Sequence, residues 1–322
     1  MATSPDRIEQ IIKELRDAEE GIFEPQVAGP SDPNHVALFG GICGVPLSVP
    51  DFTICDGLLI RQTFAHVMAP YLLAFAPPKK RGAPHPAPWK SARGGLGFDV
   101  TVEIMLTENC RPTGFDRINT LWWVLALLRL ATGAPLRMTV ISNMAFAAVP
   151  ESSTEPVFWT VEMPPHQLCL VRNPPTAISV AHLEWVRKSL VDGAVLMDTE
   201  HFNRVVQTFD SAIWAHSLGS AIVMVWAAIE TLFRPGWWQI TKTLSKCIAT
   251  YLYPAGGDRD RAYQKVEQLY EARGSAAHNS YVPESEQLFD SFQIARRCIV
   301  KCIDDRLLPD ADDLVRRWKA KS

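Results

Sequence analysis

Apolar residues change their spacing once along the chain, near residue 176. Before that point they occur in short runs that alternate with polar residues or are interrupted by proline and glycine, which is typical of β-strands. Two helices are also predicted there, one that begins after an N-cap at Ser4 and one in DRINTLWWVLALLRLA. The predicted strands lie in HVALFG, VPLSVPDFTI, GLLIRQTFA, DVTVEIML, LRMTVIS, VFWTVEM and QLCLV.

Beyond Pro174 and Pro175 the strand pattern stops, and apolar residues recur at helical spacing. Helices are predicted in AHLEWVRKSLVDGAVL, along the run from Thr199 to Phe233, and in ITKTLSKCIATYLY, DRDRAYQKVEQLYEARGSAAH, ESEQLFDSFQIARRCIVKCIDDRLL and ADDLVRRWKAK. Short polar links between them favour an antiparallel helical bundle. The sequence therefore predicts an α+β protein, with an N-terminal mixed α/β domain over residues 1–175 and an all-α domain over residues 176–322.

Residues 77–93 contain five prolines and lack hydrophobic periodicity, so they are predicted to form an exposed loop. Lys79, Lys80 and Arg81 lie together in this segment, and Trp89 follows them. Basic side chains neutralise phosphates and an aromatic ring stacks on a base, so these four residues form a candidate RNA-binding site. The alternative interpretation is a solvated proline-rich loop that binds nothing.

Composition limits the classes of function. The 322 residues carry a formal net charge of −3, which does not indicate a surface built for polyanions. The seven cysteines never form a C-x-x-C pair, which argues against a disulfide framework and a zinc module. The N-terminus has no apolar signal-peptide core, and the runs Leu121–Leu128 and Ala221–Ile229 are too short to span a membrane. The glycine clusters at 40–44 and 94–97 lack the lysine of a P-loop and are predicted turns. We expect a soluble cytoplasmic protein without a cofactor.

The segment YEARGSAAHNS, residues 270–280, carries the most informative chemistry. His278 is of a type that gains and loses a proton near neutral pH, so it suits proton transfer to or from a ribose oxygen. Arg273 stays charged and presents a planar fork to a phosphate, so it suits stabilisation of charge on phosphate oxygens. Such a pair is sufficient for cleavage of RNA through the 2′-OH, without a metal. The alternative is a surface arginine and a histidine that caps the helix.

The region from about Ala181 to Leu308 resembles the HEPN superfamily, and within it the Apea-like branch. Three pieces carry the resemblance in the family's order, namely WAAIETLF with Glu230, LSKCIATYLYP, and LYEARGSAAHN with its Arg-x4-His motif. The resemblance implies a helical bundle that forms a homodimer, and metal-independent endoribonuclease activity on RNA, often in anti-phage or toxin systems. It also implies that Arg273 and His278 are catalytic, with Glu230 as an orienting partner. The N-terminal domain would then serve sensing, binding of a partner protein, or RNA positioning.

Two positions differ from the family pattern. Gly274 stands where a polar residue is usual after the arginine, and Asn279 stands where a glycine often follows the histidine. These differences favour the alternative of a non-catalytic scaffold that only dimerises or binds a partner protein. A metal-dependent hydrolase is a third interpretation, but no H-x-x-x-H, H-E-x-x-H or acidic cluster with ligand spacing supports it.

Helix geometry adds a condition on the motif. Five residues turn a regular helix by about 500°, which leaves Arg273 and His278 about 140° apart. We therefore predict that the helix ends or bends near Gly274, because glycine destabilises a helix interior by ~0.5–1 kcal/mol relative to alanine. Glu230 ends an apolar helical segment, and a partly buried carboxylate needs a partner. Arg273 is the predicted partner; the alternative is that Glu230 is a surface residue at the end of its helix.

Overall fold

The computed structural model describes residues 37–79, 85–162, 167–236, 239–277 and 284–320. Within these ranges the first part of the chain forms a six-stranded antiparallel sheet with the strand order β2-β3-β4-β1-β5-β6. Its strands are β1 (Leu38–Cys43), β2 (Asp51–Cys55), β3 (Leu58–Ala74), β4 (Trp89–Leu106), β5 (Arg137–Ser142) and β6 (Phe158–Thr160). Helix α2 (Arg117–Thr132) follows β4, and the 3-10 helix η1 (Phe146–Glu151) follows β5. The helix predicted after Ser4 lies outside the described residues.

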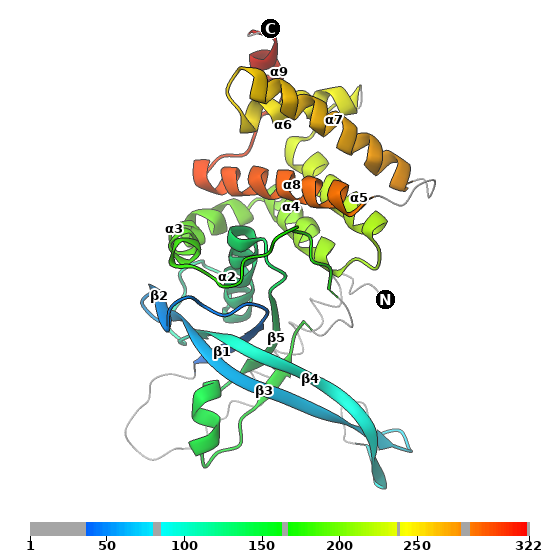
Figure 1. Cartoon of the computed structure of the whole chain (residues 1–322). Coiled ribbons are helices and arrows are strands. Elements are labelled where there is room, and N and C mark those ends of the chain that lie inside the picture. The colour runs from blue at the N-terminus through cyan, green and yellow to red at the C-terminus, as the bar shows by residue number, and fades with distance from the viewer. Residues whose placement is uncertain (1–36, 80–84, 163–166, 237–238, 278–283, 321–322) are drawn as a thin grey trace.

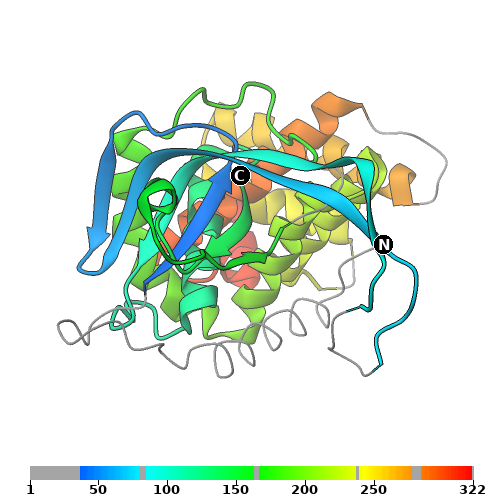
Figure 2. The same cartoon turned by 90° about the horizontal axis from the view of Figure 1, so that it is seen from below.

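The second part of the chain is helical. It contains α3 (Val180–Met197), α4 (Glu200–Ser211), the 3-10 helix η2 (Ala212–Trp214), α5 (Leu218–Phe233), α6 (Ile240–Leu252), α7 (Gly257–Ala277), α8 (Ser285–Asp305) and α9 (Ala311–Lys319). Figure 1 shows α2 and α3 between the sheet and the remaining helices, and Figure 2 shows the sheet lying across one side of the helical part. The predicted α+β class is confirmed. None of the helices in the described ranges is long and apolar enough to cross a membrane.

Local hydrogen bonds explain where α4 and α5 begin and correct two predictions. The side-chain oxygens of Thr199 and Ser217 each accept a hydrogen bond from a backbone N–H in the first turn of the helix that follows. The predicted continuous helix from Thr199 to Phe233 is therefore wrong, because residues 215–217 are not helical. The strand predicted in QLCLV is also wrong, since the N–H of Leu168 donates to the carbonyl of Ile213 (2.8 Å) instead of to a strand.

Five of the glycines predicted to form turns lie inside strands, whereas Gly44 follows the end of β1 at a bend with a φ of 133°. Gly40 and Gly41 belong to β1, and the second cluster, at residues 94–97, belongs to β4. A Cβ on Gly40 would lie 2.7 Å from Sδ of Met138, and one on Gly41 would lie 2.6 Å from the ring of Phe146. Side chains therefore approach the backbone of β1 so closely that only glycine leaves room for them. The turn prediction is therefore wrong for the glycines inside β1 and β4. At Gly40 and Gly41 the reason is this packing of distant side chains, which requires glycine in a strand.

One hydrophobic core joins the sheet, α2 and the helical part across the boundary predicted near residue 176. Trp123 of α2 is fully buried, and its Nε1 donates to the carbonyl of Leu190 in α3 (3.0 Å). Arg296 of α8 donates to the carbonyls of Leu130 and Ala131 in the last turn of α2 (2.5 and 2.6 Å). A guanidinium in this position satisfies carbonyls that the end of a helix leaves without partners. These contacts hold the helical part against α2.

Candidate functional site

Glu230 and Arg273 meet between α5 and α7. Nη2 of Arg273 lies 2.9 Å from Oε1 of Glu230, and the two side chains are 26% and 28% exposed. The predicted pairing of these residues is therefore confirmed. Because water screens the pair only in part, it is stronger than an ion pair between fully exposed side chains.

Tyr270 supplies a second donor to the same carboxylate. Its hydroxyl donates to Oε1 of Glu230 (3.0 Å), and the guanidinium carbon of Arg273 lies 5.4 Å from the centre of its ring. Tyr270 and Arg273 are three residues apart, so one face of α7 presents both. Burial, followed by the charge of Glu230, raises the pKa of Tyr270 to about 12. The hydroxyl therefore keeps its proton at neutral pH and remains a donor.

Trp226 supports this arrangement from the core. It lies one helical turn before Glu230 on α5 and is fully buried. Its ring packs edge-on against that of Tyr270, with 5.2 Å between the ring centres and 81° between the planes. Its Nε1 donates to Oγ of Ser291 in α8 (3.1 Å). Side chains from three helices therefore fix the Glu230–Arg273 pair, so its position follows from the packing of the core.

Arg273 keeps the capacity to bind a ligand. About a quarter of its side chain is exposed, so part of the guanidinium is accessible to solvent. Its Nε is buried and has no hydrogen-bond partner within the described residues. A buried donor without a partner costs ~1–3 kcal/mol, so a water molecule or another group is expected to complete its contacts. Arginine is suited to phosphate or carboxylate ligands.

His278, the second residue of the motif, lies outside the described residues, as does Asn279. α7 continues without interruption through Gly274 to Ala277, so the predicted end or bend near Gly274 is wrong. The physical reason is that the buried face of α7 extends past the glycine to Ala276, and packing of that face stabilises the helix.

Two of the candidate RNA-binding residues, Lys79 and Trp89, lie at the end of the long hairpin of β3 and β4. Lys79 is exposed, and Trp89 is 53% exposed. The Nε1 of Trp89 donates to the carbonyl of His85 (2.9 Å). β4 begins at Trp89, so the predicted loop is shorter than expected, and its last five residues are strand. Lys80 and Arg81 lie outside the described residues. The hairpin extends away from α5 and α7, which carry Glu230 and Arg273 (Figure 1). The two candidate sites are therefore apart in the structure.

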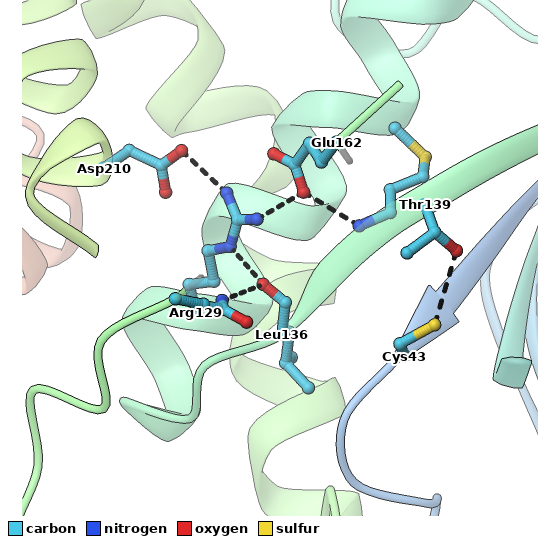
Figure 3. Close-up of polar contacts among 8 residues, drawn as sticks. Cys43, Arg129, Leu136, Thr139, Glu162 and Asp210 are labelled. Carbon is cyan, nitrogen blue, oxygen red and sulfur yellow. Dashed lines mark hydrogen bonds and ion pairs between the residues drawn. The ribbon is translucent and has the colours of Figure 1, made fainter. Parts of the chain in front are cut away.

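A charged cluster that the sequence patterns do not predict is buried between α2, α4 and the segment after β6 (Figure 3). Arg129 donates through Nη1 to Oδ2 of Asp210 (2.7 Å) and through Nη2 to Oε2 of Glu162 (2.6 Å). Its Nε donates to the carbonyl of Leu136 (2.8 Å). The same Glu162 oxygen accepts from the N–H of Met138 (2.9 Å). Burial raises the pKa of Glu162, although the charge of Arg129 opposes that shift.

This cluster is structural, because its charges satisfy one another and link α2 to α4. One signal in the sequence could have identified it. Arg129 directly follows the apolar run Leu121–Leu128, and a charge at the end of a buried helix needs partners of opposite sign. Nearby, Sγ of Cys43 lies 3.3 Å from Oγ1 of Thr139 (Figure 3). Burial raises the pKa of the Cys43 thiol, so it is not an activated nucleophile.

Comparison of the chain with models of protein families, with curated proteins and with solved structures gives no match. Within those residues, no group of three or more His, Cys, Asp or Glu side chains is placed to hold a metal ion. Fold and site together define an α+β protein whose helical part carries a partly exposed Glu–Arg–Tyr cluster.

Proposed function

We propose that this chain is an endoribonuclease of the HEPN type that cleaves RNA through the 2′-OH of the substrate. The observation that carries the proposal is the ion pair of Glu230 with Arg273, 2.9 Å long and partly exposed. It joins two of the three residues that the resemblance selects, and His278 is the third. The proposal includes a homodimer through the helical part, a cytoplasmic location, and a role in a defence or toxin system.

In the proposed reaction the ribose 2′-oxygen attacks the adjacent phosphorus while its proton passes to a base. The bond between phosphorus and the 5′-oxygen of the next nucleotide breaks, and that oxygen takes up a proton. The products are a 2′,3′-cyclic phosphate and a free 5′-hydroxyl. His278 exchanges these protons, because imidazole titrates near neutral pH. Arg273 offsets the negative charge that develops on the phosphate oxygens.

Glu230 is a positioning residue in this proposal. It holds one nitrogen of the guanidinium, and the hydroxyl of Tyr270 holds the same carboxylate oxygen. The fork of Arg273 therefore has a defined orientation before RNA binds. Orientation of this kind lowers the barrier, because the charged group does not have to be ordered during the reaction.

RNA cleavage in the presence of EDTA tests the proposal. We expect the wild-type chain to cleave a labelled RNA and to leave the matching DNA intact, because DNA lacks the 2′-OH. His278→Ala and Arg273→Ala should each lose about 100-fold or more in rate, as is typical for removal of a group that transfers protons or stabilises charge. His216→Ala is the matched control, since His216 is exposed and precedes α5. Equal cleavage by the wild type and His278→Ala would show that the assignment is wrong.

A non-catalytic scaffold is the second candidate, and one observation favours it. α7 is continuous through Gly274 to Ala277, without the break near Gly274 that the motif was expected to need. A scaffold would form the homodimer and would not cleave RNA. The cleavage assay separates the two functions, because light scattering should show a homodimer for both. Growth of cells that produce the chain is a further comparison, because an active ribonuclease slows growth.

A further inference from the structure

β3 and β4 continue beyond the rest of the sheet as a two-stranded arm (Figure 1). β2 pairs with β3 only as far as Arg61, and β1 pairs with β4 only from Val102 onward. The pairs farther out, from Met68 with Gly97 to Ala74 with Trp89, join β3 and β4 alone. We use the name arm for residues 68–79 and 89–97. A two-stranded ribbon of this kind is marginally stable in water unless something covers it.

The arm exposes large apolar side chains on both of its faces. Leu72 is paired with Ser91 and Leu73 with Lys90, and consecutive strand residues point to opposite faces. Leu72 is 58% exposed and Leu73 is 48% exposed, so the described part of the chain covers neither face. An exposed apolar surface of this extent marks a binding site. The large exposed hydrophobic residues of the arm are Met68, Tyr71, Leu72, Leu73, Phe75, Trp89 and Leu96.

Positive charge is concentrated on the same hairpin. Between residues 68 and 97 the sequence contains no Asp or Glu, and it contains five Lys or Arg. The whole chain, by contrast, has a formal net charge of −3. Lys79, Lys90 and Arg93 are exposed on the arm. The basic side chains and the exposed aromatic rings together suit a ligand that carries many negative charges and also has apolar groups to pack on the rings.

We propose that the arm binds single-stranded RNA, with bases stacked on the rings of Tyr71, Phe75 and Trp89 and phosphates against the neighbouring lysines and arginine. Aromatic side chains on a β-surface stack unpaired bases, and basic groups between them neutralise the backbone. The three rings are 50%, 64% and 53% exposed. This binding site is separate from the Glu230–Arg273 pair, and it functions whether or not the chain cleaves RNA.

Geometry favours a flexible polymer over an anionic membrane. A flat bilayer surface contacts one face of the arm and leaves the apolar side chains of the other face in water. Insertion into hydrocarbon would bury Lys90 and Arg93, which the bilayer core strongly disfavours. A single strand of RNA bends around a narrow ribbon and brings bases to both faces.

Fluorescence anisotropy with a labelled single-stranded oligouridine measures the binding. The parent is the full chain with His278→Ala, which prevents the proposed cleavage from interfering. Trp89→Ala and Tyr71→Ala should each weaken binding by about tenfold, because stacking on one base is lost. Leu307→Ala is the matched control, since Leu307 is 69% exposed but lies beyond α8, and it should bind as the parent does.

Salt dependence tests the contribution of charge. Lys90→Glu should weaken binding and reduce the slope of log affinity against log salt by roughly 0.7, the value for one phosphate contact on a single strand. Lys188→Glu makes the same change in net charge on α3, where Lys188 is exposed, and should leave the slope unchanged. These altered side chains are exposed, so the variants should unfold at the temperature of the parent.

Parallel measurements with phosphatidylserine vesicles and by light scattering separate the other partners. Binding of RNA that falls in the arm variants and is unchanged in both controls supports the proposal. The proposal is overturned if the parent does not bind RNA or if the arm variants bind it unchanged. Vesicle binding or self-association that depends on the arm, in a chain that does not bind RNA, also overturns it. Loss of the cleavage reaction does not affect this test, because binding is measured without turnover.

Discussion

Replacement of Arg129 by methionine should be among the most destabilising single changes in this protein. Methionine retains an apolar stem, but it removes the guanidinium that donates to Asp210, Glu162 and the carbonyl of Leu136. The two carboxylates are only 13% and 14% exposed. They would then remain buried without the cation that both of them contact.

The expected loss in the free energy of unfolding is about 3–5 kcal/mol, the usual effect of removing one partner from a buried ion pair. We expect the upper part of this range, because two carboxylates lose their partner at once and the Leu136 carbonyl loses a donor. Combination of Arg129→Met with Glu162→Gln and Asp210→Asn should recover much of the loss. In the triple variant no uncompensated charge stays buried, and a buried pair is often close to neutral relative to uncharged side chains.

The dependence on pH distinguishes lost charge pairing from lost packing. In the wild type, burial raises the pKa of Glu162, and Arg129 opposes that shift. Without Arg129 the opposition is gone, so the pKa of Glu162 rises further in the folded variant. In the folded variant the Glu162 carboxyl then keeps its proton at pH values where the unfolded chain, with a pKa near ~4, has released it. The free energy of unfolding of the variant therefore falls as the pH rises through the raised pKa. The deficit relative to wild type should therefore shrink as the pH is lowered.

Urea unfolding followed by tryptophan fluorescence, at about pH 7 and about pH 5, measures these differences. We expect a lower midpoint for Arg129→Met with an unchanged slope, and a smaller deficit at the lower pH. Lys188→Met is the matched control, since Lys188 is exposed on α3, and its midpoint should stay within the error. A loss below about 1 kcal/mol, or an equal loss at both pH values, would refute the reasoning.

Three further substitutions concern the site on α5 and α7. Gly274→Ala should raise the free energy of unfolding by ~0.5–1 kcal/mol, because α7 is continuous there and an added Cβ meets nothing within 4 Å. A lower Tm in calorimetry would contradict this expectation. Glu230→Gln should lower kcat for RNA cleavage by about 10–100-fold with little change in KM, because a neutral amide holds the guanidinium less firmly than a carboxylate does. The control Glu271→Gln, at an exposed position of α7, should cleave RNA as the wild type does. The pKa of Tyr270 is about 12 in the folded protein and about 10 in the unfolded chain, so between these pH values only the folded protein keeps the proton. Tyr270 therefore contributes to a loss of stability as the pH rises through this range. The unfolding midpoint of Tyr270→Phe should decline less steeply with alkaline pH than that of the wild type. Equal slopes of midpoint against pH in the two proteins would rule out this contribution.

Much of the secondary structure follows from local patterns. Alternation in DVTVEIML and helical spacing in ITKTLSKCIATYLY predict β4 and α6, because side-chain direction repeats with the backbone geometry. Two wrong predictions share one cause, which is a contact with a distant part of the chain. The N–H of Leu168 finds the carbonyl of Ile213, and Gly41 is needed in β1 by the ring of Phe146.

Part of the candidate site could likewise be predicted from the sequence, and part of it depends on the packing of the helices. The pairing of Glu230 with Arg273 could be predicted from residue type, because a carboxylate at the end of an apolar helix needs a cation. The contributions of Tyr270 and Trp226 could not, because they depend on how α7 packs against α5 and α8. The bend expected at Gly274 is wrong for a related reason: packing of the buried face of α7 outweighs the low helix propensity of one glycine.

The sequence by itself determined the α+β class, the change from strands to helices near residue 176, and the charged pair of the candidate site. Each of these depends on periodicity or on the energy of burying a charge, and both can be read from neighbouring residues. Only the tertiary structure decided that β3 and β4 extend beyond the rest of the sheet as an exposed arm and that Arg129 links α2 to α4. These features depend on where neighbouring strands end and on which distant side chains meet, and local sequence does not specify either.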